Sequence, residues 1–327
     1  MKYRNFSDLG WSVSEVGLGC WQIGGSWGKV TEKDAIDILK KAIDMGVNFF
    51  DTSDMYGDGR SEKFLSEIIK SSREDIYVTT KLGRRWRPNY PKGYKQEYIE
   101  EFIDRSLMNL GIDQIQLLQL HCPPSHICSS AKTYEMMDEI RKKGKIENYG
   151  VSVSKISDAF EAIKFPNVKS IQLVFNIFRQ KPAESFFKEA KKKNIAIIAR
   201  GPLASGLLTG TINCETRFAE SDHRNYNIDG KAFDIGDTFS GVDMQKGLLV
   251  VEELRQLLPA DFSLSDLALK WILMRDEVSV VIPGAVHKSE VKRNACVSYL
   301  EEIPWDTLLE IQSIYNNFLR SDVHHRW

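Results

Sequence analysis

Short apolar runs alternate with amphipathic stretches along most of this chain. The runs are typical of strands, and the stretches between them carry apolar residues at helical spacing. In 32–45, for example, Ile36, Leu39 and Ile43 fall on one face. Alternating strands and helices build a parallel sheet, because each helix returns the chain to the edge where the next strand starts. Counted from Val16, the pattern gives eight strands, seven helical zones between them, and more helix after the last strand.

Eight such units favour a closed (β/α)8 TIM barrel, an α/β fold, over an open doubly wound sheet. The G-x-G-x-x-G fingerprint of dinucleotide-binding open sheets is missing after the first strand. We therefore expect one barrel domain over 1–327, with an additional helix at its C-terminal end. Thr31 is the expected N-cap of the first helix, and Ser61 that of the second. The expected strands are 15–19, 47–50, 76–80, 115–120, 149–152, 170–174, 195–198 and 278–282.

One connection, after the seventh strand, is unusually long. Residues 200–241 are rich in Gly, Asp, Asn, Ser and Thr and have little periodicity. Loops of this length inside a compact domain are usually functional or disordered. We interpret this one as a lid that covers a ligand; a mobile surface insertion is the alternative.

Charge and cysteine content narrow the functional classes. Lys and Arg (44) nearly balance Asp and Glu (45), which gives no electrostatic case for nucleic acid as a partner. No run approaches the roughly 18 apolar residues of a membrane span, and no signal-peptide pattern opens the chain. Five scattered cysteines without a C-x-x-C pair favour free thiols and a cytoplasmic location. The spacing of Cys122 and Cys128 fits no common zinc pattern, so no metal is expected.

Four residues at or just beyond expected strand ends predict proton-transfer chemistry: Asp51, Tyr56, Lys81 and His121. A phenol has an ordinary pKa of about 10, which a neighbouring ammonium from Lys81 would lower. Asp51 would pair with the buried lysine, and His121 would hydrogen-bond a substrate oxygen. Tyr56 would then be the general acid in carbonyl reduction, or the base in alcohol oxidation. No flavin, haem or metal-cluster motif is found, which indicates a borrowed nicotinamide hydride donor.

The chain resembles the aldo-keto reductase superfamily from Gly10 to Asn294. The most specific match is Asp51-Thr52-Ser53-Asp54-Met55-Tyr56-Gly57 followed by Ser61-Glu62, and Thr79-Thr80-Lys81 and Leu117 to His121 extend it. The resemblance implies a barrel that binds NADPH across its C-terminal face. It also implies that Tyr56 is the acid, that Lys81 and Asp51 tune it, and that His121 is the orienting donor.

The resemblance further implies cofactor positions. Ser152 and Gln172 match residues that hold the nicotinamide amide, and Trp21 matches a loop position near the cofactor or substrate. The pyrophosphate-covering loop and the adenosine end match Gly201, Leu203, Gly206, Gly284 and Asn294.

The chain departs from the family pattern at several of these positions. Arg200 replaces the aromatic residue that usually stacks on the nicotinamide, which could favour the reduced, uncharged ring. Val286 replaces an arginine that often binds the 2′-phosphate, although Lys288 and Arg293 could compensate. Glu290 is compatible with a free 2′-hydroxyl. We therefore prefer NADPH and leave NADH open.

The substrate is expected to be a small carbonyl compound. Trp27, Met55, Trp86 and Phe218 could form an apolar wall. Arg84, with Arg85 and Arg87, could receive a carboxylate or phosphate. An aldehyde, a ketone and a sugar all fit this description, and the oligomeric state stays open.

Three other functions fit the same residues. One is an NAD-linked sugar or alcohol dehydrogenase. Another is a nicotinamide-nucleotide-binding regulatory subunit with little turnover, as the superfamily resemblance implies. A third is an aldolase-type barrel with Lys81 as Schiff-base nucleophile, against which Asp51 argues by keeping the lysine protonated.

Overall fold

Eight parallel strands form a closed barrel in a computed structural model that describes residues 1–26, 30–72, 75–84 and 94–327. The strands pair in chain order from β3 to β10. The ring closes where Gly17 N donates to Val281 O (2.8 Å) and Val281 N donates to Glu15 O (2.9 Å). The expected (β/α)8 barrel is confirmed. The strands are β3 (Leu18–Gly19), β4 (Phe49–Asp51), β5 (Tyr77–Leu82), β6 (Ile115–His121), β7 (Ile146–Ser152), β8 (Val168–Val174), β9 (Ala196–Arg200) and β10 (Val278–Val281).

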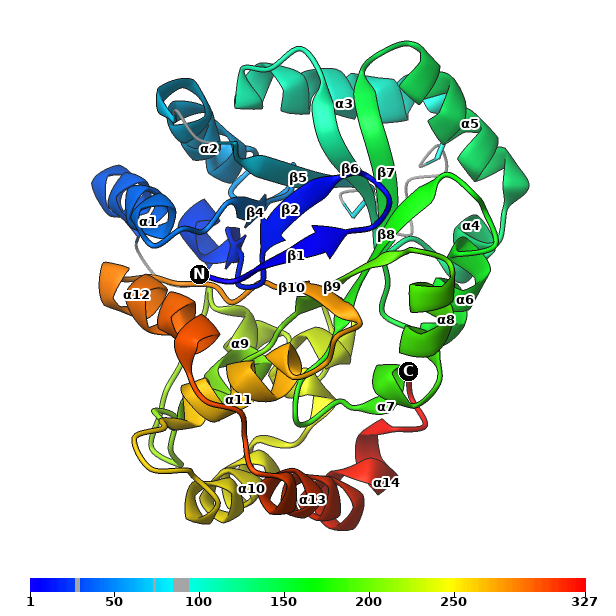
Figure 1. The fold of residues 1–327 in the computed structure, drawn as a ribbon. Helices are drawn as coiled ribbons and strands as arrows, with labels where there is room; N and C mark the ends of the chain where they lie inside the picture. The colour runs from blue at the N-terminus through cyan, green and yellow to red at the C-terminus, as the bar shows by residue number, and fades with distance from the viewer. Residues whose placement is uncertain (27–29, 73–74, 85–93) are drawn as a thin grey trace.

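Helices surround the strands, as Figure 1 shows. Each barrel strand is followed along the chain by at least one helix, and the apolar faces of these helices form the main core against the sheet. The principal helices are α1 (Glu32–Asp44), α2 (Arg60–Ser71), α3 (Gln96–Leu110), α5 (Ala131–Lys142), α6 (Ile156–Ala162), α8 (Phe186–Lys192), α11 (Leu264–Leu273) and α12 (Lys288–Cys296). Two shorter ones are α4 (Ser125–Cys128) and α7 (Lys181–Glu184). Within the described ranges, none of the helices combines the length and apolar character needed to cross a membrane.

A hairpin that the sequence did not predict precedes the barrel. Its strands β1 (Tyr3–Phe6) and β2 (Trp11–Ser14) are antiparallel and lie in front of the barrel strands in Figure 1. Phe6, Trp11 and Val13 pack against barrel residues, among them Phe49. The hairpin therefore fills the barrel's N-terminal end, and the opposite end is left for a site.

Helix starts agree only in part with expectation. Thr31 caps α1 as predicted, with its side chain accepting from Asp34 N. Ser61 as the cap of α2 is wrong, because the helix begins at Arg60 after Gly59, which has a φ of 87°. The Ser61 hydroxyl instead donates to Cys20 O (2.9 Å) and accepts from the hydroxyl of Thr52.

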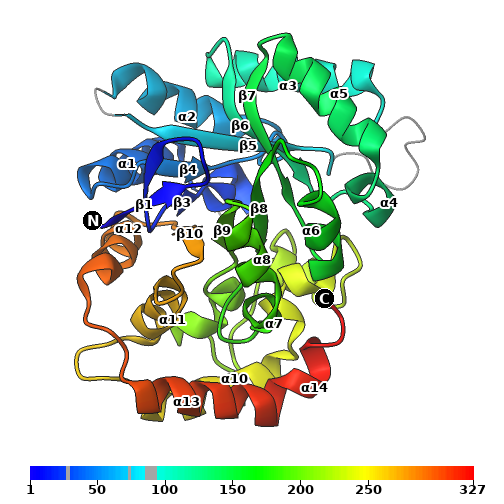
Figure 2. The same cartoon turned by 45° about the vertical axis from the view of Figure 1, so that its right-hand side comes forward.

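The long connection after β9 folds into short turns. These are η2 (Ala204–Thr209), α9 (His223–Tyr226), η3 (Ile235–Asp237) and η4 (Phe239–Gly241), and they lead into α10 (Met244–Gln256). After the barrel, α13 (Trp305–Ile314) lies along α10, and α14 (Arg320–Val323) leads the chain back toward α7, as Figure 2 shows. The additional C-terminal helix is thus present.

Candidate active site

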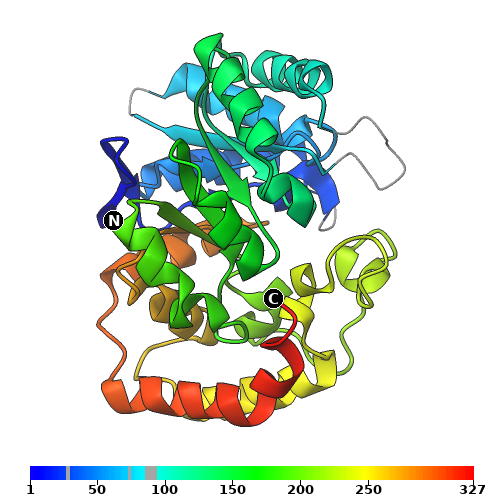
Figure 3. The ribbon, with the colours of Figure 1, turned by 90° about the vertical axis from the view of Figure 1, so that its right-hand side faces the viewer.

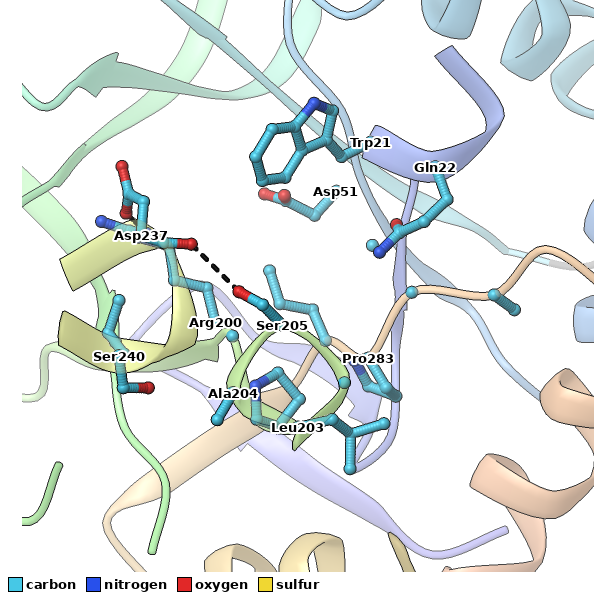
Figure 4. A pocket seen from close by; sticks show the side chains of 18 of the residues that line it. Trp21, Gln22, Asp51, Arg200, Leu203, Ala204, Ser205, Asp237, Ser240 and Pro283 are labelled. Atoms are coloured by element: carbon cyan, nitrogen blue, oxygen red, sulfur yellow. Dashed lines mark hydrogen bonds and ion pairs between the residues drawn. The ribbon is translucent and has the colours of Figure 1, made fainter. Parts of the chain in front are cut away.

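A cavity of about 350 Å³ opens at the C-terminal ends of the strands. In Figure 4, Trp21 and Gln22 from the first connection lie across it from Leu203 and Ala204 of the long connection. Asp51 projects toward the cavity from the end of β4. The volume of the cavity lies within the range usual for small-molecule sites.

The four predicted catalytic residues meet at this cavity. Lys81 Nζ lies 2.6 Å from Asp51 Oδ2 and 3.1 Å from the Tyr56 hydroxyl, and it also donates to Thr52 O. The ring of His121 stands nearly perpendicular to that of Tyr56, with the ring centroids 6.1 Å apart. Asp51, Tyr56 and His121 line the cavity, and Lys81 is fully buried behind them.

Tyr56 is placed by a close crossing of two connections. Gly57 has a φ of 59°, and a Cβ there would overlap the carbonyl of Gly24. A Cβ on Gly24 would in turn lie 2.9 Å from the backbone of Tyr56. Glycine at these two positions therefore lets the connections touch and fixes the phenol at the cavity.

Asp51 has partners for both carboxylate oxygens. Its Oδ1 accepts from Gln172 Nε2 at 2.7 Å, while Oδ2 holds the lysine. Burial raises the pKa of Asp51 above its ordinary value, and Lys81 opposes this effect. Burial works to lower the pKa of Lys81, but its pairing with Asp51 raises it overall, so the lysine stays an ammonium.

The pKa of Tyr56 shifts opposite to the expectation based on Lys81 alone. Burial raises it above the ordinary value, and the lysine charge offsets only part of that shift. The phenol therefore keeps its proton at neutral pH. A protonated Tyr56 that contacts an ammonium is arranged as a proton donor.

His121 is held neutral. Burial and the charges of Arg84 and Lys81 lower the pKa of His121 well below its ordinary value. Its Nδ1 lies 3.2 Å from the Ser53 hydroxyl, and its Nε2 lies 3.4 Å from Arg84 Nη1. A guanidinium can only donate, so Nε2 accepts and the ring proton lies on Nδ1.

Asp237 is a site residue that sequence reasoning missed. Its buried carboxylate pairs with Arg84 through Oδ2 and with Arg200 through Oδ1. Burial works to raise the pKa of Asp237, but Arg200 and Arg84 hold it well below the ordinary range. Ser205 donates to the Asp237 carbonyl at 3.2 Å, the dashed line in Figure 4. A strand-end pattern could not single out this residue, because it lies in a turn of the nonperiodic connection.

The two expected nicotinamide positions, Ser152 and Gln172, and Trp21, expected near the cofactor or substrate, lie beside the catalytic four. Trp21 lines the cavity with its ring 6.0 Å from that of Tyr56. Ser152 donates to Gln172 Oε1 at 3.2 Å, and Gln172 reaches the cavity wall. The carboxamide of Gln172 therefore connects Ser152 to Asp51.

The expected pyrophosphate and adenosine positions lie farther along the same cavity. Its walls include Gly201, Leu203, Gly206, Gly284, Glu290, Arg293 and Asn294. Arg200, expected at the nicotinamide, also lines the cavity. Glu290 uses Oε2 to accept from the backbone N–H groups of Val286 (2.7 Å) and His287 at the start of α12. Lys288 does not line the cavity; it is exposed and pairs with Asp37 at 3.3 Å. Arg293 has no ion pair with any residue that the structure describes.

The expected substrate positions are only partly brought together. Met55 and Arg84 line the cavity. Phe218 does not; it packs beneath the Arg224 guanidinium, 4.4 Å from the ring, and beside Phe239. Trp27, Trp86, Arg85 and Arg87 fall outside the described residues. Phe233, which sequence reasoning did not single out, lies under the Arg84 guanidinium at 4.9 Å.

The cavity suits a nicotinamide nucleotide. Arg200 Nε is buried and has no hydrogen-bond partner among the described residues, so a donor is left for a ligand. Gly201 and Gly206 have φ values of 61° and 101° in the wall expected to cover the pyrophosphate. Small residues in such turns let a backbone approach a phosphate closely.

The sequence and the structure of this chain are similar to those of known proteins of one family. The model of the aldo/keto reductase family matches residues 15–316. The aldo-keto reductase YhdN of Bacillus subtilis is 30% identical over 99% of this chain and 95% of its own length. The NADH-specific methylglyoxal reductase of Escherichia coli is 28% identical over 86% of this chain and 89% of its own. The structure of aldo-keto reductase AKR11C1 from Bacillus halodurans is 28% identical, superimposes with a TM-score of 0.76, and covers 96% of both chains.

Proposed function

The chain belongs to the aldo/keto reductase family and is an NAD(P)-dependent oxidoreductase, and from this premise we propose that it reduces an aldehyde or ketone to the alcohol. Tyr56 is the proton donor in this proposal. Lys81 and Asp51 hold the donor in place, and the bound nicotinamide supplies the hydride. The proposal includes sugars among the carbonyl substrates.

The position of Lys81 carries the proposal, because its Nζ lies 2.6 Å from Asp51 Oδ2 and 3.1 Å from the Tyr56 hydroxyl. As a carbonyl oxygen gains electrons it needs a proton, and Tyr56 can give one. The neighbouring ammonium stabilises the phenolate that remains, and Asp51 keeps the ammonium charged. The same pair makes a Schiff-base role for Lys81 unfavourable, since only a neutral amine is nucleophilic.

The preferred cofactor is NADPH. Arg293 lines the cavity without an ion pair to any described residue, so it can meet a 2′-phosphate. Glu290 would favour a free 2′-hydroxyl, but one of its oxygens already binds two backbone N–H groups. NADH, the cofactor named for the E. coli relative, is the alternative.

Arg84 defines the substrate class further. Its guanidinium lies at the cavity wall beside His121, where a substrate carbonyl would approach Tyr56. We infer that it receives a carboxylate or phosphate carried by the substrate.

The test combines binding with turnover. Tryptophan fluorescence is followed during titration with NADPH and with NADH, and oxidation of the bound cofactor is then measured with a panel of aldehydes, ketones and sugars. Tyr56→Phe should lower kcat by about 10²–10⁴-fold and leave cofactor affinity within twofold. Tyr299→Phe, at a tyrosine that is 64% exposed, is the matched control.

Each result has a distinct meaning. Near wild-type turnover by a folded Tyr56→Phe variant would refute the proton-donor role. Tight cofactor binding without turnover on any substrate would favour a regulatory subunit instead. Turnover that proceeds only from alcohol to carbonyl would indicate an NAD-linked dehydrogenase.

A further inference from the structure

The segment 234–241 carries Asp237 to the cavity, yet it has little structure of its own. It contains two three-residue turns, η3 and η4. Asp237 N donates to Asp234 O at 3.0 Å, and Thr238 N donates to Ile235 O at the same distance. Single turns of this kind are marginal without tertiary support. The position of Asp237 therefore depends on what packs against the segment.

The indole of Trp327 supplies much of that support. It is 6% exposed, and its Nε1 donates to Asp234 Oδ1 at 3.0 Å. The same oxygen accepts from Gly236 N at 2.8 Å, so one carboxylate joins the indole to the turn. A Cβ on Gly236 or on Gly241 would overlap the Trp327 ring. The ring thus touches the backbone on both sides of Asp237.

Arg179 completes this support. Its guanidinium lies 3.9 Å from the centroid of the Trp327 ring and donates to Ser154 O, in the connection after β7. A Cβ on Gly236 would also overlap Arg179. Figures 2 and 3 both place the C-terminal end of the chain beside the segment that follows β9. The barrel, the segment and the chain after α14 therefore meet at one buried point.

We propose that Trp327 and Arg179 are positioning residues of the active site, acting through Asp237 on the two arginines at the cavity. Trp327 fixes the segment 234–241, and the segment holds the Asp237 carboxylate between Arg84 and Arg200. Loss of the indole frees the turn and leaves the two guanidiniums without a fixed counter-charge. The effect on substrate binding rests on the reductase function proposed above, whereas the effect on the segment itself does not.

The first experiment measures amide hydrogen exchange by mass spectrometry in wild type, Trp327→Ala and Trp327→Phe. Exchange in 234–241 should become at least tenfold faster in Trp327→Ala, because opening of the segment costs less. Trp327→Phe keeps an aromatic plane but loses the N–H donor and part of the ring that contacts Gly236 and Gly241, so its exchange rate should lie between those of wild type and Trp327→Ala. Trp305→Ala, at a tryptophan that is 71% exposed, should leave this segment unchanged. Unchanged exchange in both Trp327 variants would overturn the proposal.

The second experiment separates positioning from general stabilisation. Trp327→Ala should raise KM for the best carbonyl substrate about tenfold and change kcat less than threefold, because the contacts among Asp51, Tyr56 and Lys81 are untouched. Asp237→Asn should act similarly, and the double variant should be no worse than the poorer single one.

Multiplicative effects in the double variant would mean that Trp327 does not act through Asp237, which would overturn the proposal. If wild type turns over no carbonyl compound, the reductase function fails. The exchange experiment still decides the positioning role in that case.

Discussion

Arg84 places its Nη1 3.4 Å from His121 Nε2, so this imidazole nitrogen accepts a hydrogen bond rather than donating one. The expected role of His121 as the donor to a substrate oxygen needs the other tautomer. In the arrangement observed, Arg84 donates to His121 at the cavity wall. We propose that Arg84, just beyond β5, recognises an anionic group on the substrate rather than its carbonyl oxygen, and that His121 helps to orient the arginine.

Arg84→Gln should discriminate against anionic substrates. A hydrogen bond between charged partners contributes about 1.5–3 kcal/mol, so kcat/KM should fall roughly 10–100-fold for succinic semialdehyde. Butanal, the matched aldehyde without a carboxylate, should lose less than threefold. Steady-state kinetics on the two aldehydes provide the measurement. Equal losses on both would show that Arg84 supports the site in general and recognises no anion.

Lys81→Met should destabilise the fold, apart from any effect on catalysis. It leaves the buried Asp51 without its cation, which costs about 3–5 kcal/mol in the free energy of unfolding. Combining Lys81→Met with Asp51→Asn should recover most of the lost stability, because the double variant has no uncompensated buried charge. Urea unfolding measures both. Lys33→Met breaks an exposed pair with Asp37 and should leave stability nearly unchanged.

Asp237→Asn should show a stability loss that depends on pH. The pKa of Asp237 is depressed in the folded protein, so the unfolded chain binds its proton more readily. The stabilisation is therefore fully present well above the unfolded value of about 3.9 and is lost as pH falls below it. The difference between wild type and variant should be constant near neutrality and shrink below about pH 4.

Urea unfolding at a series of pH values checks this dependence. Asp229→Asn changes a carboxylate in the same long connection that is 65% exposed, and its effect should be small throughout. A difference for Asp237→Asn that stays constant from pH 7 down to pH 3 would contradict the ion-pair account.

The sequence allowed prediction of those parts of the site that periodic elements position. Asp51, Lys81 and His121 lie at strand ends, and the strand and helix periods determine where those ends fall. Tyr56 follows the end of β4 by only five residues, so its position was predictable from the same strand end. The direction in which the pKa of Tyr56 shifts was not predictable in this way, because the burial of its side chain depends on how several connections pack around it.

Asp237 and Trp327 mark where prediction from sequence stops. Asp237 lies in a single 3-10 turn and Trp327 lies outside any helix or strand, and their partners Arg84 and Arg179 are 153 and 148 residues away in the chain. Local patterns carry no information on such pairings. The hairpin at the barrel's N-terminal end was missed although Trp11 and Val13 give β2 one apolar face. Its two strands are short, and Ser7 to Gly10 between them contains no strong hairpin signal.

Replacing Arg293 and replacing Lys288 should have different effects on cofactor binding. Both side chains are exposed, but Arg293 lines the cavity, whereas Lys288 does not and is already paired with Asp37. Arg293→Ala should therefore weaken NADPH binding about tenfold or more and leave NADH binding within twofold, because only NADPH carries the 2′-phosphate. Lys288→Ala should change neither affinity by more than twofold. Fluorescence titration of both variants with both cofactors gives the four dissociation constants. If Arg293→Ala weakened NADPH and NADH binding equally, Arg293 would contact a group that the two cofactors share. If Lys288→Ala selectively weakened NADPH binding, the lysine would be the contact for the 2′-phosphate.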